Sequence, residues 1–374
     1  MRLAIKLFTI FIVIPLNTRC QAVDKLSGMV LNADMSVTLK LHAPNSKDVY
    51  VKGSFLDRQF KVKTKAGSFG KAQKAKMKKY DGEWIYTTKP LKSEFYTYCF
   101  VVDGQEQLDP SNPYTIRDVN DYFNYFIVGG GIADNYLIQN VPHGHVEKVW
   151  YPSTLKGMSK RRMTVYTPSE YKTNTTKTFP VLYLLHGSGG DENAWEEAGR
   201  AIQILYRVKK NKANRAIAGL SLGGLHTIFI SANNPEMFDY VGLFSAQTTN
   251  ALNDNRITTL GGLATGVQSL ASKIPFLNGT KFAEKVSVFA RKFNDGRLEI
   301  YSKLDNKLKN QFANPPKLYY IAVGEDDFVK KLNDDFRAKL NAGSYKYIYN
   351  ETDGGHSWEN WRKCLIDFLP RLFK

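Results

Sequence analysis

Apolar and polar positions alternate in short runs along the first third of the chain, a pattern typical of antiparallel strands. The runs are separated by turn residues, and Asp81-Gly82 and Asp103-Gly104 are dipeptides that favour hairpin turns. The clearest runs are residues 35–41, 48–54, 84–88 and 95–103. The pattern predicts an all-β domain over residues 23–128, with the outline of a small immunoglobulin-like sandwich.

Beyond Val149 the pattern changes to buried apolar runs separated by stretches with helical spacing. The expected strands are residues 161–166, 180–185, 216–220, 317–323 and 345–349. Strands that alternate with helices predict an α/β fold with a parallel sheet, here over residues 147–374. The Gly-rich stretch that begins at Gly129 predicts a linker over residues 129–146.

Residues 1–22 have the pattern of an export signal. Arg2 and Lys6 come before a short apolar run, and the segment ends in small residues suited to cleavage. The apolar run is too short to span a bilayer. We therefore expect a secreted or periplasmic protein without a membrane span. Lipid attachment at Cys20 is the alternative, and Arg19 argues against it.

Residues 219–223 read Gly-Leu-Ser-Leu-Gly and match G-x-S-x-G, the sharp strand-to-helix turn that exposes a nucleophilic serine. Glycines are needed on both sides of Ser221 because a Cβ there would collide with the neighbouring chain. The motif by itself is also compatible with an ordinary Gly-rich loop. Its interpretation therefore depends on partners elsewhere in the chain.

Two candidate partners follow in the chain order acid, then histidine. Asp327 comes directly after the apolar run 317–323, at the sheet edge where α/β proteins place their sites. His356 lies in a Gly-containing loop before the last expected helix. A serine hydroxyl needs a base to take its proton, and the imidazole needs a carboxylate to orient it. The sequence therefore predicts Ser221, His356 and Asp327 as a catalytic triad.

A Gly-rich loop at residues 186–190 follows another apolar run and is the candidate oxyanion hole. We expect the backbone N–H groups of Ser188 and Leu222 to face the negative oxygen that develops in acyl transfer. This chemistry implies no organic cofactor. The six histidines show no convincing metal-ligand spacing, so no metal is expected either.

Composition, net charge and cysteine positions limit the possible functions of the chain. The chain has 43% hydrophobic residues, which suits folded domains, and a net charge of +17. Such a positive charge is compatible with nucleic acid or with acidic polysaccharide. The lysines are spread widely, apart from a cluster over residues 61–79, and the export signal disfavours nucleic acid. Cys99 and Cys364 fall in different expected domains, so we expect no disulfide between them.

Taken with these motifs, the chain resembles the exported esterases of carbohydrate esterase family 1, which are esterase D-like α/β-hydrolases. The matching stretches are residues 100–104, 109–113, 141–144, 150–153, 161–168, 184–187, 191–192, 219–224 and 354–356, with Trp358 and Trp361. The resemblance implies an N-terminal early-set domain, immunoglobulin-like and similar to a glycogen-binding module. It also implies that Ser221 is the nucleophile, His356 the base and Asp327 the acid, with Asp326 as the less favoured acid.

The chain departs from this family between Leu205 and Tyr206. Several tens of residues that carry a helix, a strand and a loop in the family are missing at this junction. The missing strand separates the second and third strands of the hydrolase sheet. We therefore expect a shortened sheet with an exposed edge or a new strand pairing.

The resulting hypothesis is a secreted serine esterase that hydrolyses feruloyl or acetyl esters on plant cell-wall xylan. A siderophore esterase of the enterochelin type is the alternative within the same chemistry. A polysaccharide-binding protein that has lost catalysis is an alternative of another class, supported by the shortened sheet. Residues 248–314 are expected to lie over the site. Phe276, Phe282, Phe289 and Phe293 either line an acyl pocket there or form buried helix faces.

Overall fold

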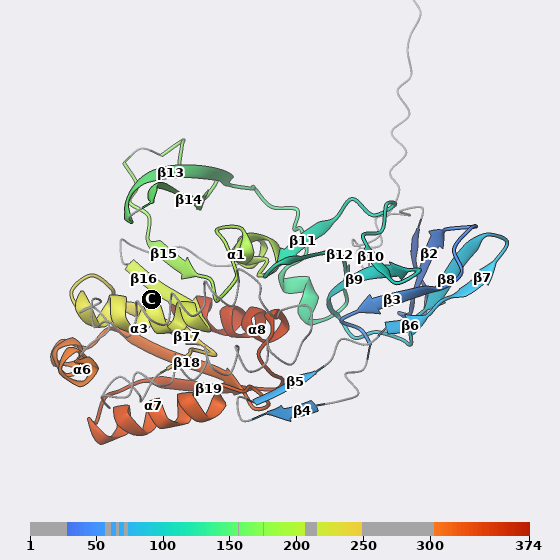
Figure 1. Ribbon diagram of the computed structural model, residues 1–374. Coiled ribbons are helices and arrows are strands. Elements are labelled where there is room, and N and C mark those ends of the chain that lie inside the picture. The colour runs from blue at the N-terminus through green and yellow to red at the C-terminus, as the bar shows by residue number, and fades with distance from the viewer. Residues whose placement is uncertain are drawn as a thin grey trace, which may run out of the picture.

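The computed structural model describes residues 28–56, 61–64, 67–70, 74–155, 157–174, 176–205, 215–248 and 303–374. An N-terminal part made of β-sheets lies beside a C-terminal α/β part (Figure 1). The expected export signal and the four phenylalanines at 276–293 lie outside the described residues. Within the described residues, no helix has the length and apolar character needed to cross a membrane.

Two antiparallel sheets make up most of the N-terminal part. The first has four strands in the order β1 (Met29–Leu31), β2 (Val37–His42), β8 (Glu83–Thr87) and β7 (Lys78–Tyr80). The second has the order β11 (Thr115–Asp118), β12 (Asp121–Val128), β9 (Glu94–Val102), β3 (Val49–Gly53) and β6 (Lys74–Lys76), with β10 (Gln105–Gln107) paired to β9. A separate hairpin joins β4 (Lys61–Thr64) and β5 (Gly67–Gly70).

Alternation with period two buries one set of side chains between these two sheets. Leu39 on β2 and Val51 on β3 are both fully buried there. Tyr98 on β9 is also fully buried and donates its hydroxyl to Asp109 at 2.7 Å. Both Asp-Gly dipeptides form two-residue hairpin loops, as the sequence predicts, and all four of their residues have positive φ.

The second sheet also buries its other face, against the α/β part. On β12, Phe126 belongs to the core between the two sheets, whereas Ile127 belongs to a core shared with the α/β part. The stretch 129–146 contains the short helix η1 (Ile132–Asn135) and the fully buried Tyr136. The two parts of the chain are therefore joined by a continuous apolar core.

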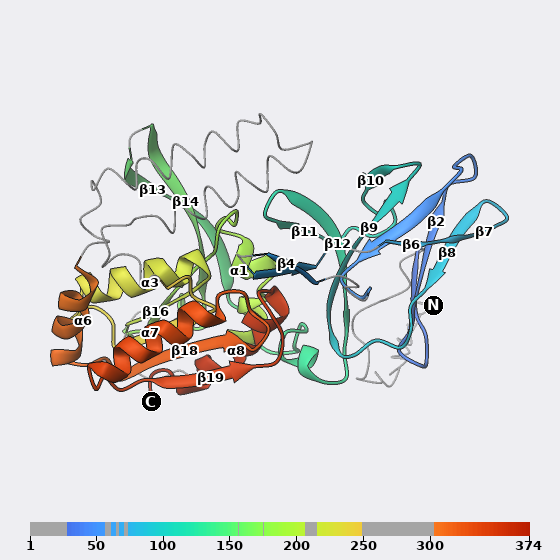
Figure 2. The same ribbon diagram turned by 60° about the horizontal axis from the view of Figure 1, so that its bottom comes forward.

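The α/β part is built on a parallel sheet of five strands in sequence order. The strands are β15 (Val181–Leu185), β16 (Arg215–Leu220), β17 (Tyr240–Phe244), β18 (Leu318–Gly324) and β19 (Ile348–Thr352). Helices α3 (Leu222–Asn233), α6 (Leu304–Ala313) and α7 (Lys330–Ala342) share one core with one face of the sheet (Figure 2). Successive residues of β18 belong alternately to this core and to a second core on the opposite face of the sheet. Helices are therefore needed on both faces.

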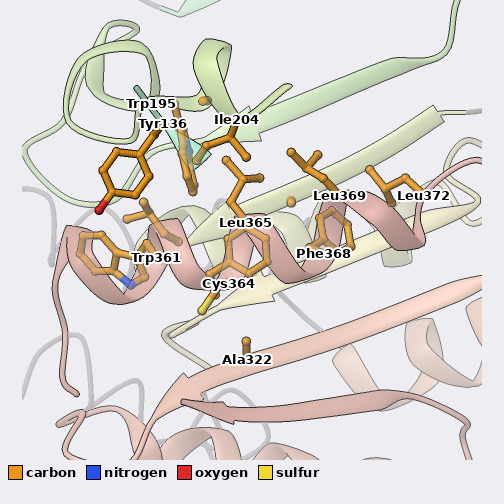
Figure 3. Packing of buried hydrophobic residues seen from close by; sticks show 14 of the residues in the cluster. Tyr136, Trp195, Ile204, Ala322, Trp361, Cys364, Leu365, Phe368, Leu369 and Leu372 are labelled. Atoms are coloured by element: carbon orange, nitrogen blue, oxygen red, sulfur yellow. The ribbon is translucent and has the colours of Figure 1, made fainter. Parts of the chain in front are cut away.

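The opposite face is covered by α8 (Trp358–Phe368), the terminal turn η3 (Leu369–Arg371) and the short helices α1 (Ala194–Glu197) and α2 (Ala201–Leu205). Figure 3 shows Leu365 and Phe368 on α8 within this core, together with Trp195 and Ile204 from the short helices. The core also includes Tyr136, so this face of the sheet is where the two parts of the chain meet.

Strand β15 is an edge of the five-stranded sheet and, among the described strands, pairs only with β16. The strands β13 (His145–Leu155) and β14 (Met158–Thr167) form a separate hairpin beyond that edge (Figure 1). A cavity of about 250 Å³ lies between β14 and β15, lined by apolar side chains such as Leu182 and Leu205. Among the described strands, β15 is thus an exposed edge of the kind that the sequence led us to expect.

Candidate active site

Ser221 stands at a sharp corner between strand β16 and helix α3. Its backbone has φ 53° and ψ −119°, a strained conformation for a residue that is not glycine. A Cβ added to Gly219 would lie 2.2 Å from the carbonyl oxygen of Gly223. A Cβ added to Gly223 would lie 2.4 Å from that of His186. The two glycines of the motif are therefore required by close backbone packing, as the sequence predicts.

His356 lies on the loop between β19 and α8, beside Ser221. Its Nε2 is 3.0 Å from Ser221 Oγ, which is hydrogen-bond distance. The loop reaches this place because Gly354 has φ 105°, and because the end of β18 packs tightly against it. A Cβ added to Gly324 would lie 2.2 Å from the carbonyl oxygen of Gly354. The loops after β18 and β19 are thus held side by side.

Asp327 follows strand β18 and faces the other nitrogen of His356. The distances from His356 Nδ1 to its two carboxylate oxygens are 2.9 and 3.1 Å. The Asp327 side chain is fully buried, and its Oδ1 also accepts a hydrogen bond from the backbone N–H of Val329 at 3.0 Å. The neighbouring Asp326 is exposed. The structure therefore brings Ser221, His356 and Asp327 together and leaves Asp326 outside the cluster.

Two aromatic rings enclose the imidazole of His356. Phe328 lies with its ring centroid 4.3 Å from that of His356, and Trp361 makes an edge-to-face contact at 5.0 Å. These rings restrict the orientation of the imidazole and keep its side chain mostly out of water, with 15% exposed. Phe328 was not among the residues singled out in the sequence, because a single aromatic after an acid carries no distinctive signal.

The Gly-rich loop after β15 lies against the nucleophile. A Cβ added to Gly187 would stand 3.2 Å from the Cβ of Ser221. The end of β15 is held by Trp195, whose Nε1 donates to the carbonyl oxygen of Leu185 at 3.1 Å. Ser188 is exposed on this loop, and Leu222 is the first residue of α3. Both candidate oxyanion donors thus belong to segments that adjoin Ser221.

The hairpin tip between β11 and β12 also reaches the site, which the sequence did not indicate. Asp118 Oδ1 accepts a hydrogen bond from Trp358 Nε1 at 3.3 Å, two residues beyond His356. Burial raises the pKa of Asp118, while this N–H acts in the opposite direction. Nothing in the alternating pattern of β11 and β12 distinguishes this tip from any other hairpin.

Burial also lowers the pKa of His226, on the first turns of α3, and the nearby His186 lowers it further. Both effects disfavour the charged form of the imidazole. In the part of the chain described by the structure, no three His, Cys, Asp or Glu side chains are grouped to hold a metal ion.

Comparison with known proteins shows similarity to esterases. Residues 200–372 match the family described as putative esterase. An endo-1,4-beta-xylanase/feruloyl esterase of Xylanibacter ruminicola is 25% identical over an alignment of 281 positions that covers 59% of this chain and 36% of that protein. An acetyl esterase of Caldicellulosiruptor saccharolyticus is 23% identical over an alignment of 234 positions that covers 53% of this chain and 85% of that protein. The chain thus spans only about a third of the first relative's length.

Among solved structures, the enterobactin esterase of Shigella flexneri superposes with a TM-score of 0.54 at 15% identity. The superposition covers 90% of this chain and 94% of that structure. At this level of identity the similarity concerns the fold, and it shows an α/β-hydrolase-like fold for the C-terminal part of the chain. The chain is therefore similar to esterases both in amino-acid sequence and in fold.

Proposed function

We propose that this chain, whose residues 200–372 match the putative esterase family, is a serine carboxylic ester hydrolase. One observation carries the proposal. His356 lies within hydrogen-bond distance of both Ser221 Oγ, at 3.0 Å, and Asp327 Oδ1, at 2.9 Å. With Ser221 at a strained strand-to-helix corner, this is the arrangement that nucleophilic acyl transfer needs.

The proposed reaction proceeds through an acyl-enzyme. Ser221 Oγ attacks the ester carbonyl carbon while His356 Nε2 takes the hydroxyl proton. When the tetrahedral intermediate collapses, the C–O bond to the alcohol breaks and His356 gives that proton to the leaving oxygen. Water then attacks the acyl-enzyme while His356 takes its proton. The bond between the acyl carbon and Ser221 Oγ breaks, His356 returns the proton to Oγ, and the acid is released. Asp327 keeps the Nδ1–H of His356 pointed toward itself, so that Nε2 is free to accept.

The backbone N–H groups of Leu222 and Ser188 are the proposed donors to the oxyanion. Leu222 follows the nucleophile at the start of α3, where N–H groups have no partner within the helix. Ser188 belongs to the loop whose Gly187 adjoins Ser221. Donors fixed before the reaction stabilise the developing charge without any reorganisation.

The proposed substrates are feruloyl or acetyl esters on plant cell-wall xylan. The printed names of the two relatives, a xylanase/feruloyl esterase and an acetyl esterase, support this substrate class. We further propose that residues 1–22 direct secretion and that residues 23–128 form an immunoglobulin-like domain, joined through 129–146 to the esterase domain 147–374. The two facing sheets with a common core support the second of these points.

The test is hydrolysis of methyl ferulate and 4-nitrophenyl acetate by the purified chain, with Ser221→Ala as control. Turnover that the variant lacks supports the proposal, and the ratio of the two rates ranks the acyl groups. Enterobactin is the third substrate of the assay, because the fold similarity extends to an enterobactin esterase. Preference for enterobactin would replace the xylan hypothesis while leaving the mechanism intact.

Absence of turnover from a cooperatively folded chain would contradict the proposal as a whole. Binding to insoluble xylan would then be measured by sedimentation. Affinity that is equal in the wild type and in Ser221→Ala would support the alternative of a polysaccharide-binding protein without catalysis.

A further inference from the structure

We propose that the tip of the β11–β12 hairpin, residues 117–119, is a positioning element of the active site. It holds the oxyanion loop from outside, and Val119 forms an apolar wall beside that loop. The N-terminal sheets would then be part of the catalytic unit, in addition to any role in binding polysaccharide. The inference rests on the proposed esterase function, and the experiment below separates the two.

Two of the three tip residues contact the oxyanion loop or the residue directly after it. Arg117 Nη1 lies 2.6 Å from Asp191 Oδ2, directly after the glycines of the loop, and both side chains are only about one-third exposed. Val119 packs on Gly189 so closely that a Cβ added to this glycine would lie 2.5 Å from Val119 Cγ1. Gly189 has φ 77°, a conformation that few other residues adopt. One hairpin thus contacts this part of the chain at two neighbouring positions, Gly189 and Asp191.

Asp118, which lies between Arg117 and Val119, contacts the segment that carries His356, the proposed base. Asp118 accepts a hydrogen bond from Trp358 Nε1 at 3.3 Å. The Trp358 ring lies edge-to-face on Trp361 at 5.1 Å, and Trp361 in turn lies on His356 at 5.0 Å. Three consecutive residues of the N-terminal part therefore contact both the proposed oxyanion loop and the packing around the proposed base.

The backbone of the tip is itself strained. Asp118 pairs with Asp121, so Val119 and Asn120 form a two-residue hairpin loop, and Val119 has φ 56°. Positive φ is a genuine outlier for a β-branched residue, and tight hairpins normally place glycine, asparagine or aspartate at such positions. A strained residue persists where its surroundings determine it and often marks a functional site. Here Val119 keeps 46% of its surface exposed while it contacts the loop.

The base of the hairpin is packed into the protein core, which allows the tip to act as a support. Ile116 on β11 is buried in the core shared with the α/β part, together with Ile127 on β12. The oxyanion loop, by contrast, contains three glycines within residues 187–190 and has little side-chain packing of its own. An N–H donor stabilises the transition state only if it is held in place. We therefore expect the oxyanion loop to depend on contacts with residues outside it, such as those of the hairpin tip.

The decisive variant is Val119→Gly, which removes the contact with Gly189 and relieves the strain. We expect kcat for 4-nitrophenyl acetate to fall about tenfold with KM within about a factor of two, because the loop acts in the transition state. The Tm should not decrease. Asp81→Gly is the matched control, since Asp81 has φ 46° at the same position of a hairpin remote from the site. It should leave kcat unchanged.

A second measurement covers the case in which Val119→Gly folds poorly. Arg117→Gln, Asp191→Asn and the double variant form a thermodynamic cycle on kcat. We expect each single variant to lower kcat and the double variant to be no worse than either. Wild-type kcat in Val119→Gly, or additive effects in the cycle, would overturn the positioning role while wild-type turnover stands. A wild-type chain without turnover would contradict the proposed function itself, and this inference with it.

Discussion

Arg362 on helix α8 and Glu94 on strand β9 form an ion pair across the junction of the two parts of the chain. Arg362 Nη2 donates to Glu94 Oε1 at 2.8 Å, and the side chains are only 3% and 9% exposed. The hydroxyl of Tyr136 donates to the same carboxylate oxygen, and Arg362 Nη1 donates to the carbonyl oxygen of Ala198 at 2.7 Å. This polar network lies inside the apolar core that joins the sheets to the α/β part.

Replacing Glu94 by glutamine should therefore destabilise the whole chain. The buried guanidinium of Arg362 would lose its counter-charge while its other contacts remain, a situation that typically costs about 3–5 kcal/mol. The free energy of unfolding in urea measures the effect. Glu106→Gln is the matched control, because the pair of Glu106 with Lys52 on the same sheet is more exposed and is expected to contribute about 0–1 kcal/mol. Equal losses in the two variants would contradict the prediction.

The exposed edge of the parallel sheet should promote self-association. Val181 and Tyr183 on β15 are 42% and 48% exposed on a strand that, among the described residues, pairs on one side only, and such an edge can pair with another chain. Tyr183→Lys places a charge on that edge and should lower the apparent mass seen by light scattering at high concentration. Tyr171→Lys, which changes an equally exposed tyrosine in a loop, should not. The same mass for Tyr183→Lys and wild type would exclude association through β15.

Strands with a clear apolar pattern, such as β2, β3 and β9 in the N-terminal part and β16 and β18 in the α/β part, follow from the sequence because each buries at least one face. Others, such as β12, β13 and β17, were not expected from it. One expected strand also has shifted bounds. The alternation of tyrosines predicts a last strand at residues 345–349, whereas β19 spans Ile348–Thr352. Tyr345 stacks on Phe312 of α6 at 4.4 Å between ring centroids, so its burial comes from a helix contact and not from the sheet. Periodicity cannot distinguish these two kinds of burial.

The three triad candidates could be found from the sequence because their motifs and chain order are specific. The contacts of Arg117 and Val119 with the oxyanion loop could not. They join single residues far apart in the chain, and no periodic pattern marks them. The ion pair of Glu94 and Arg362, which are 268 positions apart, could not be predicted from the sequence for the same reason. Contacts between the two parts of the chain depend on how these parts pack, which composition and spacing do not encode.

The raised pKa of Asp118 leads to a prediction about pH. Burial makes ionisation of this carboxyl more costly in the folded chain than in the unfolded chain. Its contribution to the free energy of unfolding must therefore fall as the pH rises above its ordinary pKa of 3.8. Asp118→Asn is neutral at every pH and keeps an oxygen to accept from Trp358. The Tm of the variant relative to wild type should thus increase from about pH 4 toward pH 7. A constant difference would show that Asp118 does not titrate in this way.

Asp326 and Asp327, which are adjacent after β18, allow a test of which carboxylate orients the imidazole of His356. Asp327→Asn keeps the size of the side chain but leaves no charge to stabilise the imidazolium, and its N–H₂ group favours the wrong tautomer. We expect kcat for 4-nitrophenyl acetate to fall about 1,000- to 10,000-fold. Asp326→Asn changes an exposed neighbour and should leave kcat within about a factor of two. Because Asp327 faces Nδ1 of His356 at 2.9 Å, the reverse order of effects would require a rearranged loop.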